Sequence, residues 1–404
     1  MGKLFHNYLN TFNGLSREVW WLSLITLINR AGTMVIPFLS LYLTEDLDFT
    51  LSNVGTVMAC FGLGSVVGSW LGGKLTDVIG YYKVMVRSLI STGVLFIALQ
   101  FLNTFYALCL GIFLVMVVAD MFRPAMFVAL SAYSKPENKT RSVTLIRLAI
   151  NLGFSAGPAV GGIIITSIGY SGLFWVDGIT CILATVVLVL VLNPKKSKVL
   201  DVVKVEHPES AYADKAFVIF LGAMFLFGFI FLQYFSTMPL YYRDRHVLSE
   251  FEIGLLLGMN GFVIFLLEMP LISWLEKSGL SKMTLILIGA LLTTLSFLVL
   301  NFTPWSGVLI IGMLLMTIGE MIAFPFSNAF AYERASKGNQ GEYMALYTIS
   351  FSLSHIFSHK IGMEMVADLD YDNTWYIITA IGAICVFLLF FLKSYLKGEK
   401  KLLR

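Results

Sequence analysis

The sequence predicts an all-α polytopic membrane protein, with twelve transmembrane helices arranged as two pseudo-symmetric six-helix bundles. Three observations predict this fold class: an apolar composition, repeated apolar runs of about 20 residues, and an internal repeat. Of the 404 residues, 57% are hydrophobic and only 13% are charged, and the mean hydropathy is +0.81. Soluble domains carry about 25% charged residues, so this chain has too few polar side chains to cover a soluble core.

The apolar runs follow one another along the whole chain. A helix needs about 20 apolar residues to cross roughly 30 Å of hydrocarbon. Twelve runs meet this requirement, at residues 19–43, 52–76, 84–103, 106–133, 142–167, 172–192, 216–241, 252–275, 283–302, 305–332, 342–366 and 373–396. Several of them contain proline, among them Pro37, Pro124, Pro158, Pro239 and Pro325, which spans tolerate because neighbouring helices satisfy the freed backbone groups.

The distribution of Lys and Arg predicts the orientation. Most of the 28 cations lie in the termini and in alternate loops, whereas the opposite loops carry only Arg243 and Arg245. Cytoplasmic loops are enriched in Lys and Arg, so we expect both termini to be cytoplasmic. The polar N-terminal segment lacks the features of a signal peptide. We expect a multi-pass protein of a cell membrane of the bacterial inner-membrane type, with the lipid bilayer as a partner.

The two halves repeat one another. The polar stretch 193–215 predicts a cytoplasmic linker between an N-terminal bundle, 1–192, and a C-terminal bundle, 216–404. One loop motif occurs twice, 199 residues apart, as Asp77, Gly80 and Lys83 and then as Glu276, Gly279 and Lys282. Asp120 and Glu320 are likewise 200 residues apart. Transporters commonly have such repeats.

Gly73 to Lys83 resembles the loop motif of the major facilitator superfamily, in which a glycine is followed by an acid, a second glycine and bases. The glycines permit a tight turn. The resemblance implies a conformational latch formed by Gly73, Asp77, Gly80 and Lys83, with Glu276 in the second copy. Because related motifs occur in both halves, the resemblance covers essentially the whole chain.

The fifth run contains Gly153, Gly157, Pro158, Gly161 and Gly162, which resemble the fifth-helix signature of drug–proton antiporters in that superfamily. This resemblance implies proton-coupled export, including multidrug efflux. Residues 106–119 contain no arginine, although those antiporters often carry one there. The alternative interpretation is a face of small residues that serves only helix packing.

A third resemblance points to proton-coupled peptide transporters. Gly319 and Glu320 are similar to their tenth helix, and Arg30 matches the arginine of their first-helix motif, whose two acids are replaced by Thr26 and Asn29. Uptake of peptides or similar zwitterionic solutes is therefore the alternative function.

Charged side chains near mid-depth are the candidate site residues, because each costs about 2.5–3.5 kcal/mol in hydrocarbon. Proton coupling is assigned to Glu320 first, and then to Asp120, Glu268, His355 and His359. Substrate binding is assigned to Arg30, Asn29, Arg123, Arg147, Lys360, Tyr42 and Tyr234. Asp120 and Arg123 are three residues apart, which is compatible with a structural ion pair or with a proton site. Asp177 and Glu364 lie closer to the outer ends and are given less weight.

The sequence thus predicts a proton-coupled secondary transporter of a small organic solute that works by alternating access. A membrane enzyme is disfavoured because no catalytic triad, metal cluster or phosphate-binding loop is evident. His355 and His359 have no identifiable third metal ligand, and the four cysteines fit packing roles, so no metal and no cofactor are expected. We expect a monomer that binds protons and a small molecule, and no nucleic acid.

Overall fold

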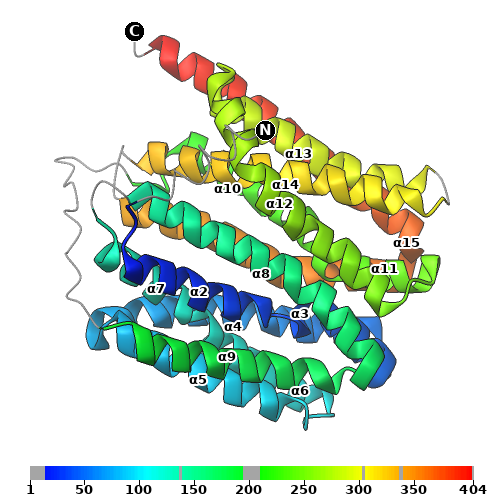
Figure 1. The fold of residues 1–404 in the computed structure, drawn as a ribbon. Coiled ribbons are helices and arrows are strands. Elements are labelled where there is room, and N and C mark those ends of the chain that lie inside the picture. Colours follow the sequence, from blue (N-terminus) through cyan, green and yellow to red (C-terminus); the bar gives the residue numbers. More distant parts are fainter. Residues whose placement is uncertain (1–13, 136–138, 194–209, 303–304, 336–339, 403–404) are drawn as a thin grey trace, which may run out of the picture. The chain divides into compact units, whose positions relative to one another are not determined.

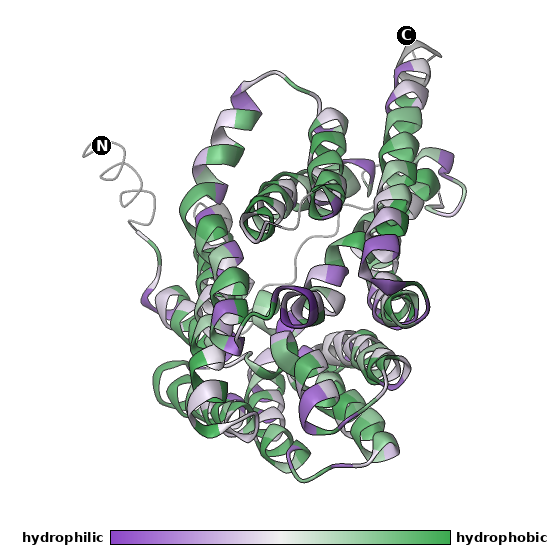
Figure 2. Ribbon diagram, turned by 90° about the vertical axis from the view of Figure 1, so that its right-hand side faces the viewer, coloured by the Kyte–Doolittle hydropathy of each residue, from purple (hydrophilic) through white to green (hydrophobic). Residues whose placement is uncertain are grey.

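The computed structural model describes residues 14–135, 139–193, 210–302, 305–335 and 340–402. Within these ranges the chain consists of helices and short connections, without strands. Figure 2 shows that hydrophobic residues predominate along the helices, with hydrophilic residues interspersed. The prediction of an all-α membrane protein is confirmed.

Eleven helical stretches in the described ranges are long and apolar enough to cross a membrane. The elements of the first six spans are α2 (Arg17–Ala31), α3 (Val35–Leu41), η1 (Tyr42–Asp46), α4 (Leu51–Ile79), α5 (Tyr81–Leu99), α6 (Phe105–Asp120), α7 (Phe122–Tyr133), α8 (Lys139–Ile168) and α9 (Ser171–Val191). Those of the remaining spans are α10 (Lys215–Leu232), η3 (Gln233–Phe235), α11 (Thr237–His246), α12 (Glu250–Lys277), α13 (Lys282–Leu298), η4 (Val299–Asn301), α14 (Gly307–Ala335) and α15 (Gln340–Leu402).

The last helix, α15, accounts for two spans. Its backbone is interrupted at Asp370, where φ is 69° and ψ is 175°. Its apolar stretch Tyr343–Gly398 has 56 residues. At 1.5 Å per residue this stretch would extend about 84 Å if straight, more than twice the thickness of the hydrocarbon. With two spans in α15, the described ranges contain the twelve predicted crossings.

The chain forms two compact units. Unit 1 comprises Met1–Tyr42, Leu63–Asp201 and Ser249–Phe265, and unit 2 comprises Leu43–Gly62, Val202–Leu248 and Leu266–Arg404. Two of the long helices therefore contribute to both units: the first part of α4 belongs to unit 2, and the first part of α12 belongs to unit 1. The sequence-based division at 193–215 stays a prediction, and residues 194–209 of that linker lie outside the described part.

Prolines explain three interruptions of the spans. Proline has no N–H and its ring clashes with the carbonyl of the residue four positions earlier, so helices break there. Pro37 lies in α3, four residues after Thr33, and Thr33 lies in the gap between α2 and α3. Pro124 lies four residues after Asp120, where α6 ends. Pro239 lies four residues after Phe235, next to a non-helical Ser236 (φ −124°, ψ −69°).

Unit 1 is held together by close helix contacts and an apolar core. In α4, a Cβ on Gly64 or Gly68 would lie 2.5 and 2.3 Å from backbone oxygens of α6. On Gly72 it would lie 2.6 Å from the Cα of Met121, at the gap between α6 and α7. Elsewhere in the unit α2 packs along α8 and α9, and α5 packs along α9 (Figure 1). The interrupted spans one and four are thus fixed by tight packing.

Unit 2 has an aromatic core. Phe217 and Phe220 of α10 contact Tyr343 and Tyr347 of α15, with ring centroids 4.6 and 6.0 Å apart. Helix α10 packs along α15, and α13 packs along α14. All four aromatic residues are buried. This core fixes the ends of spans seven and eleven.

Candidate functional site

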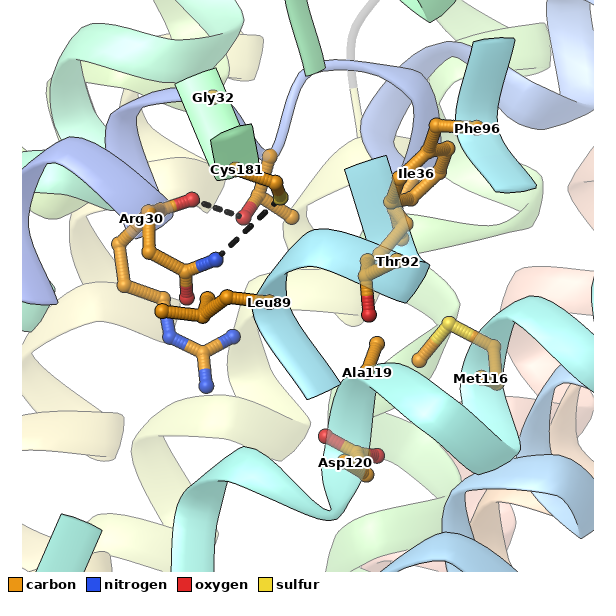
Figure 3. Close-up of a pocket in the computed structure, with 12 residues that line it drawn as sticks. Arg30, Gly32, Ile36, Leu89, Thr92, Phe96, Met116, Ala119, Asp120 and Cys181 are labelled. Carbon is orange, nitrogen blue, oxygen red and sulfur yellow. Dashed lines mark hydrogen bonds between the residues drawn. The ribbon is translucent and has the colours of Figure 1, made fainter. Parts of the chain in front are cut away.

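A polar pocket in unit 1 lies where two proline-induced interruptions meet. It is lined by the region around the break in span one (Asn29, Arg30, Gly32, Thr33, Ile36), by α5 (Leu89, Thr92, Phe96), by the end of α6 (Met116, Ala119, Asp120) and by Cys181 of α9 (Figure 3). The cavity has a volume of about 40 Å³. One water needs about 10–15 Å³ of such space, so the pocket has room for a few waters or for one polar group of a larger molecule.

Arg30 supplies the positive charge of the pocket. Its guanidinium carbon lies 5.5 Å from the centre of the Phe154 ring, a cation–π distance. Asp120 attracts this guanidinium and Arg123 repels it. The Arg30 Nε is buried and makes no hydrogen bond to another described residue.

Asp120 supplies the negative charge, and Ser65 of α4 donates a hydrogen bond to its Oδ2. The sequence suggested a pairing with Arg123, but the helix is interrupted between the two residues, because α6 ends at Asp120 and α7 begins at Phe122. Arg123 is exposed. Asp120 lines the pocket together with Arg30, whereas Arg123 does not.

The pocket contains a second buried polar atom without a partner in the described part of the chain, Oγ1 of Thr92. Leaving a buried polar group unpaired costs about 1–3 kcal/mol. Figure 3 shows Thr92 on the same pocket as Arg30 and Asp120. One cation, one carboxylate and one hydroxyl thus border a cavity of the right size for a small charged or polar group.

The break in span one is fixed by Asp177, a residue to which less weight was assigned from the sequence. Asp177 of α9 is completely buried, and its carboxylate accepts hydrogen bonds from the backbone N–H groups of Met34, at 2.9 and 3.0 Å, and Val35, at 2.9 Å. One turn further along α9, Cys181 accepts a 3.5 Å hydrogen bond from the Asn29 side chain. Pro37 could have indicated the break, but nothing in the sequence shows which side chain caps it.

The two histidines of span eleven lie in unit 2. The ring centroids of His355 and His359 are 5.7 Å apart, and they lie 6.0 and 6.2 Å from that of Phe61 in the first part of α4. His359 is buried, and neither of its ring nitrogens makes a hydrogen bond within the described ranges. A Cβ on Gly62 would lie 2.9 Å from the Cβ of His355, so α4 and α15 are in close contact here. The described residues contain no group of three His, Cys, Asp or Glu side chains that could hold a metal ion.

Lys360 is engaged beside these histidines. Its Nζ donates to the backbone oxygen of Ser52, at 3.0 Å, and to the Ser52 hydroxyl, at 2.9 Å, and lies 3.0 Å from Glu364. Of the residues that sequence reasoning assigned to substrate binding, only Asn29 and Arg30 line the pocket. Proton coupling and substrate binding stay predictions at all of these positions.

Both tyrosines assigned to binding are buried in aromatic packing. The ring centroid of Tyr42 lies 5.8 and 5.1 Å from those of Tyr170 and Phe174, and the ring centroid of Tyr234 lies 4.9 Å from that of Phe297. Glu268 is buried in α12, and Glu320 and Arg147 are partly buried, each with further interactions of its own. None of these five residues borders the pocket.

The residues of the two resemblance motifs occupy turns and helix contacts. Gly80 and Gly279 both have positive φ, 86° and 71°, as the tight turns require. Gly73, Lys83 and Glu276 lie near these turns, and the side chain of Asp77 lies outside the described part. Cβ atoms on Gly153, Gly157 and Gly161 would lie 2.5–3.3 Å from span one, and on Gly162 2.5 Å from the Glu250 backbone. The carbonyl of Pro158 lies 2.4 Å from a Cβ built on Gly254. The latch function stays a prediction.

Comparison with known proteins identifies relatives along most of the chain. A Na(+), Li(+), K(+)/H(+) antiporter of Planococcus maritimus is 20% identical over 393 residues, covering 89% of this chain and 92% of that protein. The quinolone resistance protein NorA of Staphylococcus aureus is 27% identical over 305 residues, covering 74% and 77%. An uncharacterized MFS-type transporter of Bacillus subtilis, YqjV, is 25% identical over 378 residues, covering 90% of each.

Solved structures share the fold. A POT family transporter in complex with 5-aminolevulinic acid has a TM-score of 0.80 at 15% identity, covering 95% of this chain and 97% of that one. The nucleoside transporter NupG has a TM-score of 0.73 at 14% identity, covering 93% and 100%. The model of the Major Facilitator Superfamily matches residues 22–359. Its members and the relatives above are transporters and not enzymes, and this chain belongs to the Major Facilitator Superfamily.

Proposed function

We propose that this transporter is a proton-coupled antiporter that exports a small zwitterionic or amphiphilic solute by alternating access. The observation that carries the proposal is a pair of buried atoms beside Asp120, Arg30 Nε and Thr92 Oγ1. They border a small pocket and have no hydrogen-bond partner among the residues that the structure describes. Buried polar groups are normally hydrogen-bonded, so this arrangement favours a polar occupant. A pocket of about 40 Å³ is far below the roughly 300–1,000 Å³ of a drug site, so it would hold one end of the solute.

The coupling follows from competition at Asp120. The ionised carboxylate would bind the cationic group of the solute, while Arg30 binds its anionic group. Protonation of Asp120 removes the negative charge and releases the cationic group, so proton and solute exchange. Relatives named as a cation/proton antiporter and as a quinolone resistance protein support exchange and export. Quinolones such as norfloxacin carry both a carboxylate and an ammonium group, which makes norfloxacin a suitable probe.

The alternative is proton-coupled uptake of a peptide-like solute, and the unpartnered Arg30 Nε favours it. In that case a proton on Asp120 would weaken the attraction between Asp120 and Arg30. The guanidinium would then be available for the carboxylate of the solute, and proton and solute would bind together. The two candidates use the same residues but move protons in opposite directions relative to the solute.

Proteoliposomes that contain a trapped pH dye distinguish the candidates. With norfloxacin supplied outside, antiport moves protons out and raises the internal pH, whereas symport lowers it. Dialanine, NaCl and KCl are tested in parallel, and protein-free liposomes control for passive permeation. If none of the four solutes changes the internal pH relative to these liposomes, proton-coupled transport of these solute classes is rejected.

Variants then test the assignment of residues. Asp120→Asn is expected to abolish solute-dependent proton movement, and Glu320→Gln tests the acid at the equivalent position of the second half. Asp368→Asn, an exposed acid of α15, serves as the matched control and is expected to retain coupling. Unchanged coupling in the double variant Asp120→Asn/Glu320→Gln would exclude both carboxylates as proton carriers.

A further inference from the structure

The break in span one lacks a cap of its own. Helix α3 begins after Met34, whose side chain makes no capping hydrogen bond. The first N–H groups of a helix have no partner within the helix, and a nearby side chain of the same chain segment usually accepts from them. Here the acceptor comes from another span, because both oxygens of Asp177 accept hydrogen bonds from the N–H groups of Met34 and Val35. The two elements are 143 residues apart in the sequence.

The same break forms a wall of the pocket. Asn29, Arg30, Gly32, Thr33 and Ile36 all line the cavity, and they lie within five residues of Met34. Pro37 prevents the helix from closing across the gap, so the gap itself cannot fix the direction of Arg30. The contact that holds Met34 and Val35 therefore acts on the same wall of the pocket that carries Arg30, beside the close packing of Gly153 on the Arg30 Cβ.

Helix α9 contacts the break with one face. Asp177, Thr180 and Cys181 are three and four residues apart, so they share a helical face. A Cβ on Gly32 would lie 1.8 Å from Oγ1 of Thr180, so α9 backs directly against the gap. Cys181 accepts the hydrogen bond from Asn29. We refer to Asp177, Thr180 and Cys181 as the span-six clamp.

The carboxylate is chemically suited to this position. Asp177 is completely buried. The N–H groups that donate to it lie at the N-terminus of a helical segment, where the helix dipole favours a negative charge. An amide at the same place would offer one oxygen and turn an NH₂ group toward backbone N–H groups. An alanine would leave both N–H groups without an acceptor.

From these contacts we propose that Asp177 is a positioning residue for substrate binding: it fixes the break in span one and thereby holds Arg30 in place at the pocket. The proposal rests on the proposed function only in assigning Arg30 to the solute. The clamp itself is independent of that assignment and can be measured without transport. A purely structural cap would stabilise the protein without affecting the affinity for the solute.

Hydrogen–deuterium exchange measures the clamp directly, in the full chain in detergent micelles. The peptide that covers residues 28–40 is expected to exchange about tenfold faster in Asp177→Ala, with a smaller increase in Asp177→Asn. The peptide covering 230–240, at the interrupted seventh span, is expected to remain unchanged. Unchanged exchange at 28–40, or an equal increase in both peptides, would overturn the clamp.

Cysteine labelling gives a second readout with an internal control. Cys181 is buried in the wild type and lines the pocket, whereas Cys60 and Cys109 are partly accessible. In Asp177→Asn, alkylation of Cys181 by N-ethylmaleimide, quantified by peptide mass spectrometry, is expected to increase at least about fivefold relative to these two cysteines. A proportional increase at all three would indicate general loosening and contradict a local clamp.

Transport kinetics test the positioning role. For norfloxacin in proteoliposomes, Asp177→Asn is expected to raise KM about tenfold and to leave kcat within about threefold. Loss of folded protein would instead lower the apparent kcat at constant KM. Faster exchange with an unchanged KM would leave Asp177 as a cap only and overturn the positioning role. If norfloxacin is not transported by the wild type, the proposed substrate class fails, while exchange and labelling still decide the clamp.

Discussion

Spans one and seven occupy equivalent places in the two halves of the sequence, and both are interrupted four residues before a proline, Pro37 and Pro239. They place a buried acidic residue at opposite ends. In unit 1 the acid lies at the break, where Asp177 accepts hydrogen bonds from two backbone N–H groups, and the helix starts at a neutral cap, Ser16. In unit 2 the acid lies at the start of the helix and is Asp214.

The break in span seven is satisfied without any charge. The Gln233 Nε2 donates to the backbone oxygen and the hydroxyl of Ser358, both at 2.9 Å, and its Oε1 accepts from Thr237 at 2.8 Å. The amide belongs to the interrupted span itself and connects it to α15. The carboxylate at the break in span one belongs to a different span. At the first break, the backbone groups are therefore bonded by a side chain of another span. At the second break, the hydroxyl groups of Ser236 and Thr237 bond backbone oxygens of span seven itself, those of Leu232 and Gln233.

The largest effect is expected from the charged cap of unit 2. Asp214 is bonded by Arg334, at 2.5 and 2.7 Å, and by Tyr343, at 3.2 Å, and its side chain is 3% exposed. Asp214→Asn leaves the Arg334 guanidinium without its counterion, and we expect a loss of about 3 kcal/mol of unfolding free energy at neutral pH. Denaturant titration in mixed micelles measures this change. Glu333→Gln, which removes an exposed pair with Lys282, is the control and should cost less than about 1 kcal/mol.

The stabilisation lost in Asp214→Asn is also expected to depend on pH. Burial raises the pKa of Asp214, but the hydrogen bonds from Arg334, Phe217 and Tyr343 and the charge of Arg334 outweigh it and hold the pKa below its ordinary value. A lowered pKa means that the stabilisation is complete above the ordinary value of about 3.9 and is lost as the pH falls through the folded-state pKa. The difference between wild type and Asp214→Asn should stay constant from about pH 8 to pH 5 and decrease below about pH 4. A difference that already decreases at pH 6 would assign the effect to another group.

The second largest effect is expected at the neutral break. Gln233→Leu removes three hydrogen bonds among fully buried partners, and we expect a loss of about 2 kcal/mol. Gln100→Leu is the control, because the Gln100 amide makes a single hydrogen bond, to Ile97 at the end of its own helix. Gln233→Leu is expected to leave KM for norfloxacin unchanged, whereas Asp177→Asn is expected to raise it. Equal effects of the two variants on KM would contradict a difference between the two breaks.

The neutral cap of unit 1 should contribute less. Ser16 accepts from the N–H of Val19, at 3.4 Å, and its hydroxyl donates to the Tyr133 carbonyl, at 2.9 Å. Ser16→Ala is expected to cost about 1 kcal/mol, a typical value for the loss of a helix cap. Ser394→Ala, on an exposed part of α15, serves as the control and should change stability by less than about 0.5 kcal/mol. If Ser16→Ala lowered the unfolding free energy as much as Asp214→Asn does, the neutral cap and the charged cap would not differ in strength.

The sequence predicts the fold because apolar length and charge bias are local properties, and the prolines mark possible breaks. It does not predict which prolines interrupt a span. Pro124 follows the end of α6, whereas Pro325, 201 residues later, lies inside the continuous α14. The outcome depends on neighbours such as Gly72, which allows α4 to approach the backbone of Met121. Arg30 and Asp120 could be named as candidate site residues because a charge within the membrane is costly, which is also a local criterion.

The partners of those residues could not be predicted in this way. Asp177 has no charged neighbour in the sequence, and its position toward the outer end of span six suggested that it could reach the membrane surface. Its role becomes visible only when span six lies against the break in span one. Ser65 and Thr92 belong to a similar class, because their hydroxyl groups matter only through Asp120 and the pocket.

The smallest effect is expected at the end of α11, which continues span seven beyond its break. His246 contacts the Tyr241 hydroxyl at 3.2 Å, and burial together with the neighbouring Arg245 lowers its pKa. A histidine with a lowered pKa is neutral in the folded protein, so the unfolded chain binds more protons once the pH falls below the ordinary value of about 6.5. Stability should therefore decrease as the pH is lowered from 6.5 toward the folded-state pKa. His246→Gln is expected to reduce this decrease by less than about 1 kcal/mol, measured by thermal unfolding between pH 7.5 and 5.5. The Glu333→Gln control should keep the slope of the wild type, and a steeper slope in His246→Gln would assign the pH dependence to another group.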